Sequence, residues 1–209
     1  MDCLYLQDNL PDQSMKPQLY LLLLLAQFLF LSSCQTDYTT LPTYTPRKQL
    51  QAVIEVPAGS STKMRYNRQT KKFEADKLAG QDRIIEFLPY PANFGFIPST
   101  EINAQAKPLE IVVLSGRLEA GTVLEVIPIG VLQLETDGEL DHKVVAVPAR
   151  PSERTMSVTD LASFSSRYPA AKEILQQWFV HHNPTAKSKL VGWRNEQFAE
   201  QEVQRWMKL

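Results

Sequence analysis

The chain has 209 residues, 22% of which are charged, and its formal net charge is −1 at pH 7. Acidic and basic side chains are interspersed and there is no basic block, which argues against a nucleic-acid partner. The two cysteines, Cys3 and Cys34, lie near the N-terminus and provide neither a disulfide framework nor a zinc site. We therefore expect a domain that is stabilised by its apolar core alone.

Residues 1–34 are expected to be a targeting signal and not part of a fold. The run from Leu19 to Leu31 is apolar except for Gln27, and it is shorter than the roughly 20 residues that cross a bilayer. It ends in Leu-Ser-Ser directly before Cys34, which resembles a bacterial lipobox whose cysteine is lipidated. Met15, which a lysine follows, would be a natural start of translation. The alternatives are an uncleaved anchor helix or a buried helix.

A lipidated Cys34 would anchor the protein to a bacterial membrane, with the domain outside the cytoplasm on the periplasmic side. Gln35 after the cysteine resembles the pattern for export to an outer membrane. Residues 35–49 are rich in Thr, Tyr and Pro and have no apolar periodicity, which predicts a flexible tether. The remaining residues 50–209 have a normal size for one domain with one core.

Short apolar runs predict β-strands in the first half of this domain. Residues 53–56 form one run, and residues 63–66 and 71–73 flank a polar stretch that favours a hairpin. Residues 84–88 are a further strand candidate. Residues 109–114 are almost continuously apolar, which predicts a strand with both faces covered.

A longer strand is predicted over residues 123–134. It contains Pro128 and Gly130, which favour a bulge or a sharp bend of the kind that barrel strands need. Asp137-Gly138 is a hairpin turn signal, and residues 143–147 would form the returning strand.

Helices are expected only near the C-terminus. Residues 157–164 offer Thr159 and Asp160 as caps, Pro169 suits the first position of a second helix, and Asn195 can cap the last one. One face of the second helix would carry Ile174, Leu175, Trp178, Phe179 and His182.

Residues 90–98 read Tyr-Pro-Ala-Asn-Phe-Gly-Phe-Ile-Pro. Proline fixes φ and glycine frees it, so this backbone must follow one particular irregular path. The three aromatic residues supply more apolar mass than a plain turn needs. The segment is therefore expected to line a site or to close a barrel, and a packed loop in a β protein is the alternative.

Four further blocks are residues 53–60, 107–114, 128–132 and 141–148. In this order and at these spacings, they resemble the soluble, magnesium-dependent inorganic pyrophosphatase family. The resemblance extends from about residue 50 to the C-terminus. It implies a mainly β, α+β fold, which is a twisted five-stranded barrel of the oligonucleotide-binding type with two main helices packed outside.

The resemblance implies hydrolysis of pyrophosphate to two phosphates. Such a reaction needs several magnesium ions on carboxylate ligands and cationic side chains on the phosphates. The resemblance places Lys63, Arg83 and Lys143 as phosphate-binding residues, and Tyr90 as the hydroxyl of the central motif. A tyrosine–lysine pair of the family corresponds here to His182-Asn183, which loses a positive charge.

Four acids match the metal ligands of the family in some form. They are Glu55, Glu110, Asp141 and Asp137. Asp137 is a stand-in, because the family's aspartate position falls on Thr136. Glu110 and Tyr90 are also the candidates for a catalytic role.

The two positions that face the nucleophilic water in the family carry Gln105 and Lys107 in place of aspartates. An ammonium about 4 Å from a dication would be repelled by several kcal/mol at a surface site. Lys107 could instead act as a fixed cation between Glu110 and Asp141 where the metal would lie. The alternative is an exposed loop lysine without a role.

Three functions remain open from these residues. The protein could still hydrolyse pyrophosphate, weakly or with a changed metal demand. It could be a pseudoenzyme that binds a phosphate-like anion, or a scaffold for a protein partner. The replaced aspartates favour impaired or lost activity. We expect pyrophosphate or a phosphate-like anion and a membrane as partners, allow a homo-oligomer, and expect no metal pair from His142, His181 and His182.

Overall fold

The computed structural model of the chain describes residues 36–100 and 107–207. The predicted signal with Cys34, and Gln105, which was predicted to replace a metal ligand, lie outside the described residues. Among the helices that are described, none has the length and the apolar character that a bilayer crossing requires.

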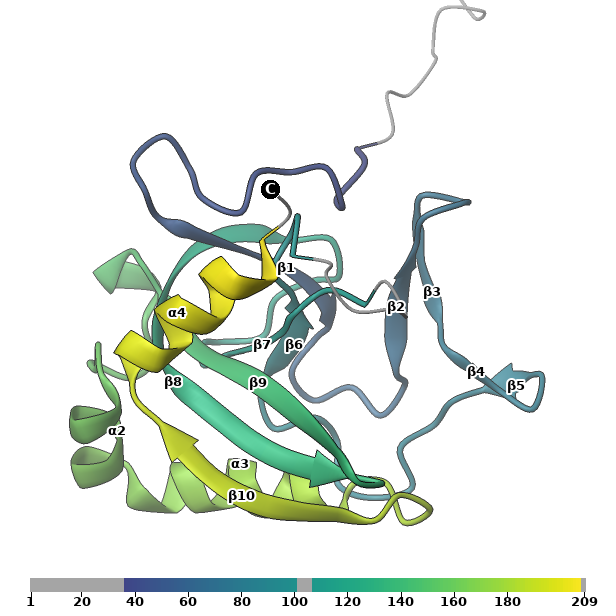
Figure 1. Cartoon of the computed structure of the whole chain (residues 1–209). Coiled ribbons are helices and arrows are strands. Elements are labelled where there is room, and N and C mark those ends of the chain that lie inside the picture. Colours follow the sequence, from purple (N-terminus) through teal and green to yellow (C-terminus); the bar gives the residue numbers. More distant parts are fainter. Residues whose placement is uncertain (1–35, 101–106, 208–209) are drawn as a thin grey trace, which may run out of the picture. The chain divides into compact units, whose positions relative to one another are not determined.

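Six strands form one sheet, and a further pairing between its first and fifth strands closes five of them into a ring (Figure 1). The spatial order is β1–β6–β7–β9–β8–β10, and every neighbouring pair is antiparallel except β7 and β9. The predicted five-stranded barrel is confirmed. The bounds are β1 Leu50–Val56, β6 Asn93–Phe96, β7 Glu110–Val113, β8 Val123–Thr136, β9 Glu139–Pro148 and β10 Ser188–Arg194.

Strand β8 turns the corner that lets the barrel close. Its register against β9 shifts between Pro128 and Gly130, which confirms the predicted bulge. The backbone of β10 approaches closely there, because a Cβ on Gly130 would lie 2.6 Å from the carbonyl oxygen of Arg194. The first part of β8 pairs with β1 and the last part with β10.

The central motif forms strand β6 and closes the barrel between β1 and β7. All four residues from Asn93 to Phe96 are buried. Gly95 is required at this position, because a Cβ would lie 1.9 Å from the carbonyl oxygen of Val53 on β1. The centre of the motif is therefore a strand that closes the barrel, and Tyr90 and Phe94 also line a cleft.

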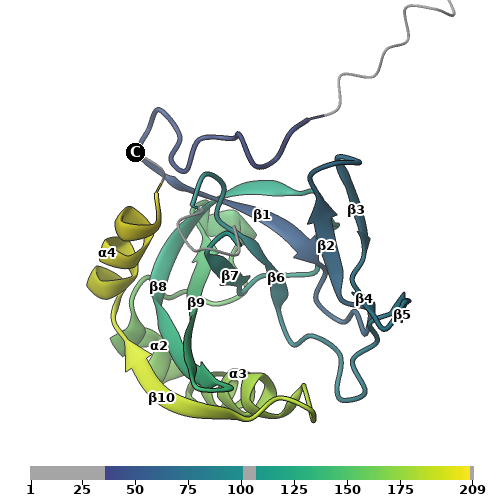
Figure 2. The ribbon, with the colours of Figure 1, turned by 45° about the vertical axis from the view of Figure 1, so that its right-hand side comes forward.

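Within the described residues, three α-helices pack outside the barrel (Figure 2). The predicted caps Asp160 and Asn195 and the first-turn position of Pro169 are confirmed, whereas the other cap candidate, Thr159, does not cap a helix. Helix α2 spans Leu161–Arg167, with the Asp160 side chain accepting a hydrogen bond from the Ser163 N–H. Helix α4 spans Glu196–Trp206 and is capped in the same way by Asn195. The other elements are α3 Pro169–His181 and the short 3-10 helix η1 Pro151–Glu153.

The apolar residues of the strands pack on two sides. Val112 and Val145 belong to the cluster that includes α3, and their neighbours Ile111 and Val144 belong to the cluster that α4 covers. This confirms that β7 is covered on both faces. On α3, Leu175, Trp178 and Phe179 are buried, but Ile174 is 57% exposed, so its predicted place on the buried face is wrong.

Outside the main sheet, β2 Met64–Asn67 and β3 Lys72–Ala75 form the predicted hairpin, and β4 Lys77–Leu78 pairs with β5 Gln81–Asp82. The strand predicted over residues 84–88 is wrong. Ile84 makes only an isolated bridge to Thr62, and its apolar neighbours Phe87 and Leu88 are largely exposed. Strand β10 was not predicted, because its sequence is mixed in polarity and its pairing with β8 is nonlocal.

Residues 36–49, which were expected to be a flexible tether, pack against the barrel. The Tyr38 ring lies edge-on to Tyr66 and Phe73, with centroids 5.2 and 5.0 Å apart. The buried Thr43 hydroxyl donates to the carbonyl oxygen of Pro98 at 2.9 Å, and the Ser99 hydroxyl donates to a carbonyl of the same segment. The aromatic and hydroxyl side chains of this segment show no periodicity in the sequence, but they fit the surface of the folded domain.

Candidate functional site

A cleft of about 650 Å³ opens beside the β8–β9 hairpin, between the start of β7 and the ends of α3 and α4. It brings together nearly all of the described residues that the resemblance singles out. Glu55 is the exception and lines an adjoining depression of about 330 Å³. The cleft is lined, among others, by Lys63, Arg83, Tyr90, Lys107, Glu110, Thr136, Asp137, Asp141, Lys143, His182 and Asn183.

Strand register explains why three of these side chains meet. Glu110 on β7 pairs directly with Lys143 on the parallel strand β9. Asp141 precedes Lys143 by two residues and therefore points to the same face of β9. The Lys143 ammonium donates to the Glu110 carboxylate and to Asp141 Oδ1, the latter at 2.7 Å. These two bonds place the charge of Lys143 between the two acids, and the residue is only 8% exposed.

This cluster keeps its members charged at neutral pH. Burial alone would raise the pKa of Glu110, but Lys143 and Lys63 outweigh it and lower that pKa to about 2. Burial would likewise lower the pKa of Lys143, but Glu110 and Asp141 raise it. The cation between the two carboxylates is therefore Lys143, and the expectation that Lys107 would lie there is wrong. Lys107 is exposed and lines the same cleft.

Lys63 lies in the same cleft without an acidic partner. Its ammonium is 5.9 Å from the centre of the Phe94 ring, and no hydrogen bond or ion pair joins it to any residue in the described ranges. Burial and the positive charges of Arg83, Lys143 and Arg65 lower the pKa of Lys63, which Glu110 opposes. A buried ammonium of this kind favours a nearby anion, because the anion would replace the hydration that burial removes.

Arg83 and Tyr90 complete the donor side of the cleft. Arg83 lies 3.5 Å from the Asp76 carboxylate. Tyr90 is 3% exposed, and its ring packs 4.5 Å from that of Trp178 on α3 and 5.6 Å from that of Phe94. Burial and Glu110 raise the pKa of Tyr90, so its hydroxyl is a neutral donor at physiological pH.

The outer face of the β8–β9 hairpin carries a polar network that the sequence did not suggest. His142 Nδ1 lies 2.8 Å from Glu202 on α4, and His142 Nε2 lies 2.9 Å from Gln133, which accepts from Arg194 at 2.8 Å. His142 lies between Asp141 and Lys143 in sequence, but it points to the opposite face because side chains alternate along a strand. The network attaches α4 to the hairpin, and two of its members, His142 and Glu202, also line the cleft.

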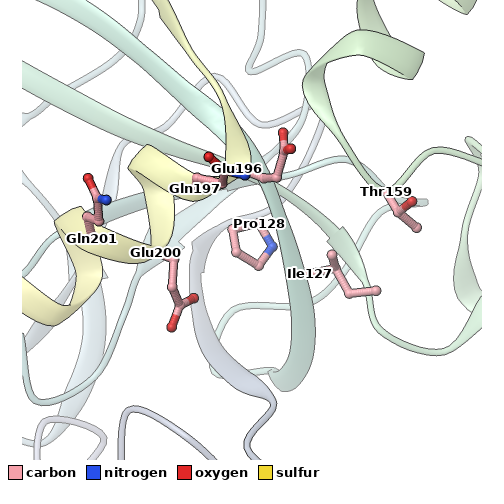
Figure 3. A pocket seen from close by; sticks show the side chains of 7 residues that line it. All are labelled: Ile127, Pro128, Thr159, Glu196, Gln197, Glu200 and Gln201. Atoms are coloured by element: carbon pink, nitrogen blue, oxygen red, sulfur yellow. The ribbon is translucent and has the colours of Figure 1, made fainter.

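A second depression, of about 470 Å³, lies beside the first turns of α4 (Figure 3). Two carboxylates project there from one face of the helix, but both already have partners. Glu200 accepts from the Tyr44 hydroxyl at 2.8 Å, and Glu196 accepts from the Leu161 N–H at 3.4 Å. This depression is a junction between α4, the N-terminal segment and α2, so the cleft is the stronger candidate site.

A family model for inorganic pyrophosphatase matches residues 52–209 of the chain. The chain belongs to the inorganic pyrophosphatase family. An inorganic pyrophosphatase of Mesorhizobium japonicum is 30% identical over 166 residues, which cover 76% of this chain and 88% of that protein. The corresponding protein of Brucella melitensis biotype 1 is 31% identical over 166 residues, with 74% and 86% covered.

Solved structures support the same family. The crystal structure of the inorganic pyrophosphatase from Thermus thermophilus superposes with a TM-score of 0.71 at 28% identity, and the match covers 82% of this chain and 97% of that one. The barrel and its outer helices are therefore those of an inorganic pyrophosphatase.

The inorganic pyrophosphatase family uses Mg²⁺, but the four candidate acids do not form a metal-binding set here. Glu110 and Asp141 are bonded to Lys143. Glu55 accepts from the Tyr66 N–H at 2.7 Å, and burial raises the pKa of Glu55 to about 7. Asp137 accepts from the backbone of Lys187 at 3.0 Å, at the predicted hairpin turn.

Within the described ranges, no three or more His, Cys, Asp and Glu side chains are grouped closely enough to hold a metal ion. The Thr136 hydroxyl lies 3.0 Å from the Ser188 hydroxyl. Among the described residues, the donor set therefore does not fit a magnesium site, whereas the cations Lys63 and Arg83 still line the cleft.

Proposed function

We propose that this inorganic pyrophosphatase family member binds pyrophosphate or a phosphate-like anion in the cleft, and that its magnesium-dependent hydrolysis is impaired or lost. One observation carries the proposal, namely that the Lys143 ammonium lies between Glu110 and Asp141. A dication between these acids would have to displace a buried cation that already has two partners.

The chemistry of hydrolysis gives this observation its weight. The attacking hydroxide is produced at neutral pH because a metal ion lowers the pKa of bound water. The acids that would hold such an ion are bonded elsewhere, and Lys107 adds a positive charge to the same cleft. Anion binding needs only the cations, and Lys63 supplies one that has no counter-ion among the described residues.

The decisive assay is phosphate release from magnesium pyrophosphate by the purified full chain, with Mn²⁺ and Zn²⁺ in parallel. We expect no turnover, together with a rise in melting temperature when pyrophosphate is added. Multiple turnovers per second would contradict the proposed loss of activity. A failure of both phosphate and pyrophosphate to shift the melting temperature would contradict the proposed binding.

The double substitution Gln105→Asp with Lys107→Asp tests whether metal loss is the cause. We expect it to gain magnesium-dependent turnover, because it restores two carboxylates and removes one positive charge. The single variant Lys107→Gln is the matched control, since it removes the charge without adding a ligand. If the double variant gains nothing, the defect lies elsewhere, with Thr136 and Asn183 as the next positions to replace.

We also propose that a lipidated Cys34 anchors the protein to a bacterial membrane. The apolar run and the Leu-Ser-Ser-Cys sequence support this proposal. Metabolic labelling with palmitate tests this, and labelling that persists in Cys34→Ala would contradict it.

A further inference from the structure

The His182 side chain is held in one orientation at the end of α3. Its ring stacks on the Trp178 indole, with centroids 4.4 Å apart and planes within 10°, and lies edge-on to Phe179 at 5.9 Å. His182 Nδ1 is 3.1 Å from the carbonyl oxygen of Phe179. A carbonyl oxygen can only accept a hydrogen bond, so Nδ1 carries the proton and Nε2 of the neutral ring is an acceptor.

The cleft keeps this histidine neutral. Burial, together with the positive charges of Lys63, Lys143 and Arg83, lowers the pKa of His182 to about 4, although the hydrogen bond to Phe179 opposes this. At physiological pH the ring therefore presents a lone pair at Nε2. Apart from the bond made by Nδ1, the His182 ring has no hydrogen bond to any residue in the described ranges.

Two hydrogen-bond donors that line the same cleft also lack a partner. The Lys63 ammonium and the Tyr90 hydroxyl have no hydrogen-bond partner within residues 36–100 and 107–207. None of the described side-chain polar atoms is fully buried without a partner, so these groups face the open cleft and not a sealed interior. The cleft thus offers the Lys63 and Tyr90 donors and, at His182 Nε2, a neutral acceptor. A complementary ligand has acceptor oxygens and also a hydroxyl proton.

We propose that His182 makes the cleft selective for a protonated phosphate oxyanion, the monohydrogen phosphate group, over sulfate. The inference rests on the proposed anion binding. Lys63 and Tyr90 would hold the anionic oxygens, and His182 Nε2 would accept the hydrogen bond of the P–O–H group. Sulfate has the same shape and charge but no proton at neutral pH, so one of its oxygens would face the Nε2 lone pair. Such an unmatched contact costs about tenfold or more in affinity.

Calorimetric titration of the full chain with inorganic phosphate, pyrophosphate and sulfate at pH 7 in EDTA tests this selectivity. We expect at least one phosphate ligand to bind about tenfold or more tightly than sulfate. Comparing the titrations with inorganic phosphate and pyrophosphate shows whether the cleft prefers free phosphate or the terminal phosphate group of a larger ligand. Mildly alkaline pH removes the last proton of pyrophosphate but leaves inorganic phosphate singly protonated, so the ratio to sulfate affinity should fall for pyrophosphate and persist for inorganic phosphate. Sulfate is the control for titration of Lys63, which would affect both anions alike.

His182→Phe keeps an aromatic ring on Trp178 but removes the acceptor, and it should reduce the ratio to about one. His181→Phe is the matched control, because His181 is the exposed neighbour that does not line the cleft. His182→Tyr replaces the acceptor with a hydroxyl donor and should favour sulfate relative to the native chain. Melting curves establish that each variant folds.

Equal affinities for phosphate and sulfate in the native chain would overturn the inference and leave the proposed anion binding standing. A ratio that survives in a folded His182→Phe variant would overturn the role of His182. Binding of none of the three anions would overturn the proposed function itself, and the selectivity with it.

Discussion

Two lysines in one cleft illustrate how position decides the role of a charge. The ammonium groups of Lys63 and Lys143 lie 5.9 and 5.8 Å from the centre of the same Phe94 ring. Lys143 lies between two carboxylates, which raise its pKa, whereas Lys63 has no acidic partner among the described residues and its pKa is lowered. Lys143 neutralises acids of the protein, and Lys63 is left for a ligand. Four substitutions test this comparison.

The largest effect on stability is expected for Lys143→Met. It would leave Glu110 and Asp141 partly buried beside each other without their cation, and should lower the free energy of unfolding by about 3 kcal/mol. Urea denaturation measures this loss. Adding Glu110→Gln and Asp141→Asn to the variant should recover most of it. A loss below about 1 kcal/mol would show that Lys143 does not neutralise these acids.

Acid should weaken the same cluster. The pKa of Glu110 falls from an ordinary 4.5 to about 2 on folding, so its contribution is complete above pH 4.5 and is lost as the pH drops toward 2. We expect a loss of about 2 kcal/mol over this range, which urea titrations at several pH values would measure. Glu110→Gln should remove this part of the pH dependence. Glu153→Gln, at an exposed carboxylate on η1 outside the cleft, is the control and should leave this part of the pH dependence unchanged.

Glu55 should show the opposite pH dependence. Burial raises its pKa from an ordinary 4.5 to about 7, so the folded state loses stability as the pH rises from 4.5 through 7. Glu55→Gln keeps an oxygen for the Tyr66 N–H and should raise the free energy of unfolding at pH 8 by about 1 kcal/mol. Denaturation at pH 5 and pH 8 checks this, and an equal effect at both pH values would contradict it.

The smallest effect on stability is expected for Lys63→Met. No ion pair is lost among the described residues, so the free energy of unfolding should change by less than about 0.5 kcal/mol. The rise in melting temperature with phosphate or pyrophosphate should nevertheless disappear, because the cation without a counter-ion is gone. Lys72→Met, an exposed lysine on β3, is the control and should leave that rise unchanged. An unchanged rise in melting temperature in Lys63→Met would show that Lys63 is not the cation that binds the anion.

Local features of the fold followed from the sequence. The caps Asp160 and Asn195, the Asp137-Gly138 turn and the bulge near Gly130 depend on residues close together in the chain, whose backbone preferences act alone. The separated motifs also predicted the barrel, because they resemble those of a known family. The same residues also identified most of the cleft, since Lys63, Arg83, Tyr90, Glu110 and Asp141 were all named in advance.

The tertiary structure decided what depends on contacts between distant parts of the chain. The pairing of Glu110 with Lys143 across parallel strands placed that lysine, and not Lys107, between the acids. The pairing of β10 with β8 and the packing of residues 36–49 on the barrel also depend on surfaces that exist only after folding. Sequence patterns report which face a side chain takes along its own strand, whereas the partner opposite it is set by strand register.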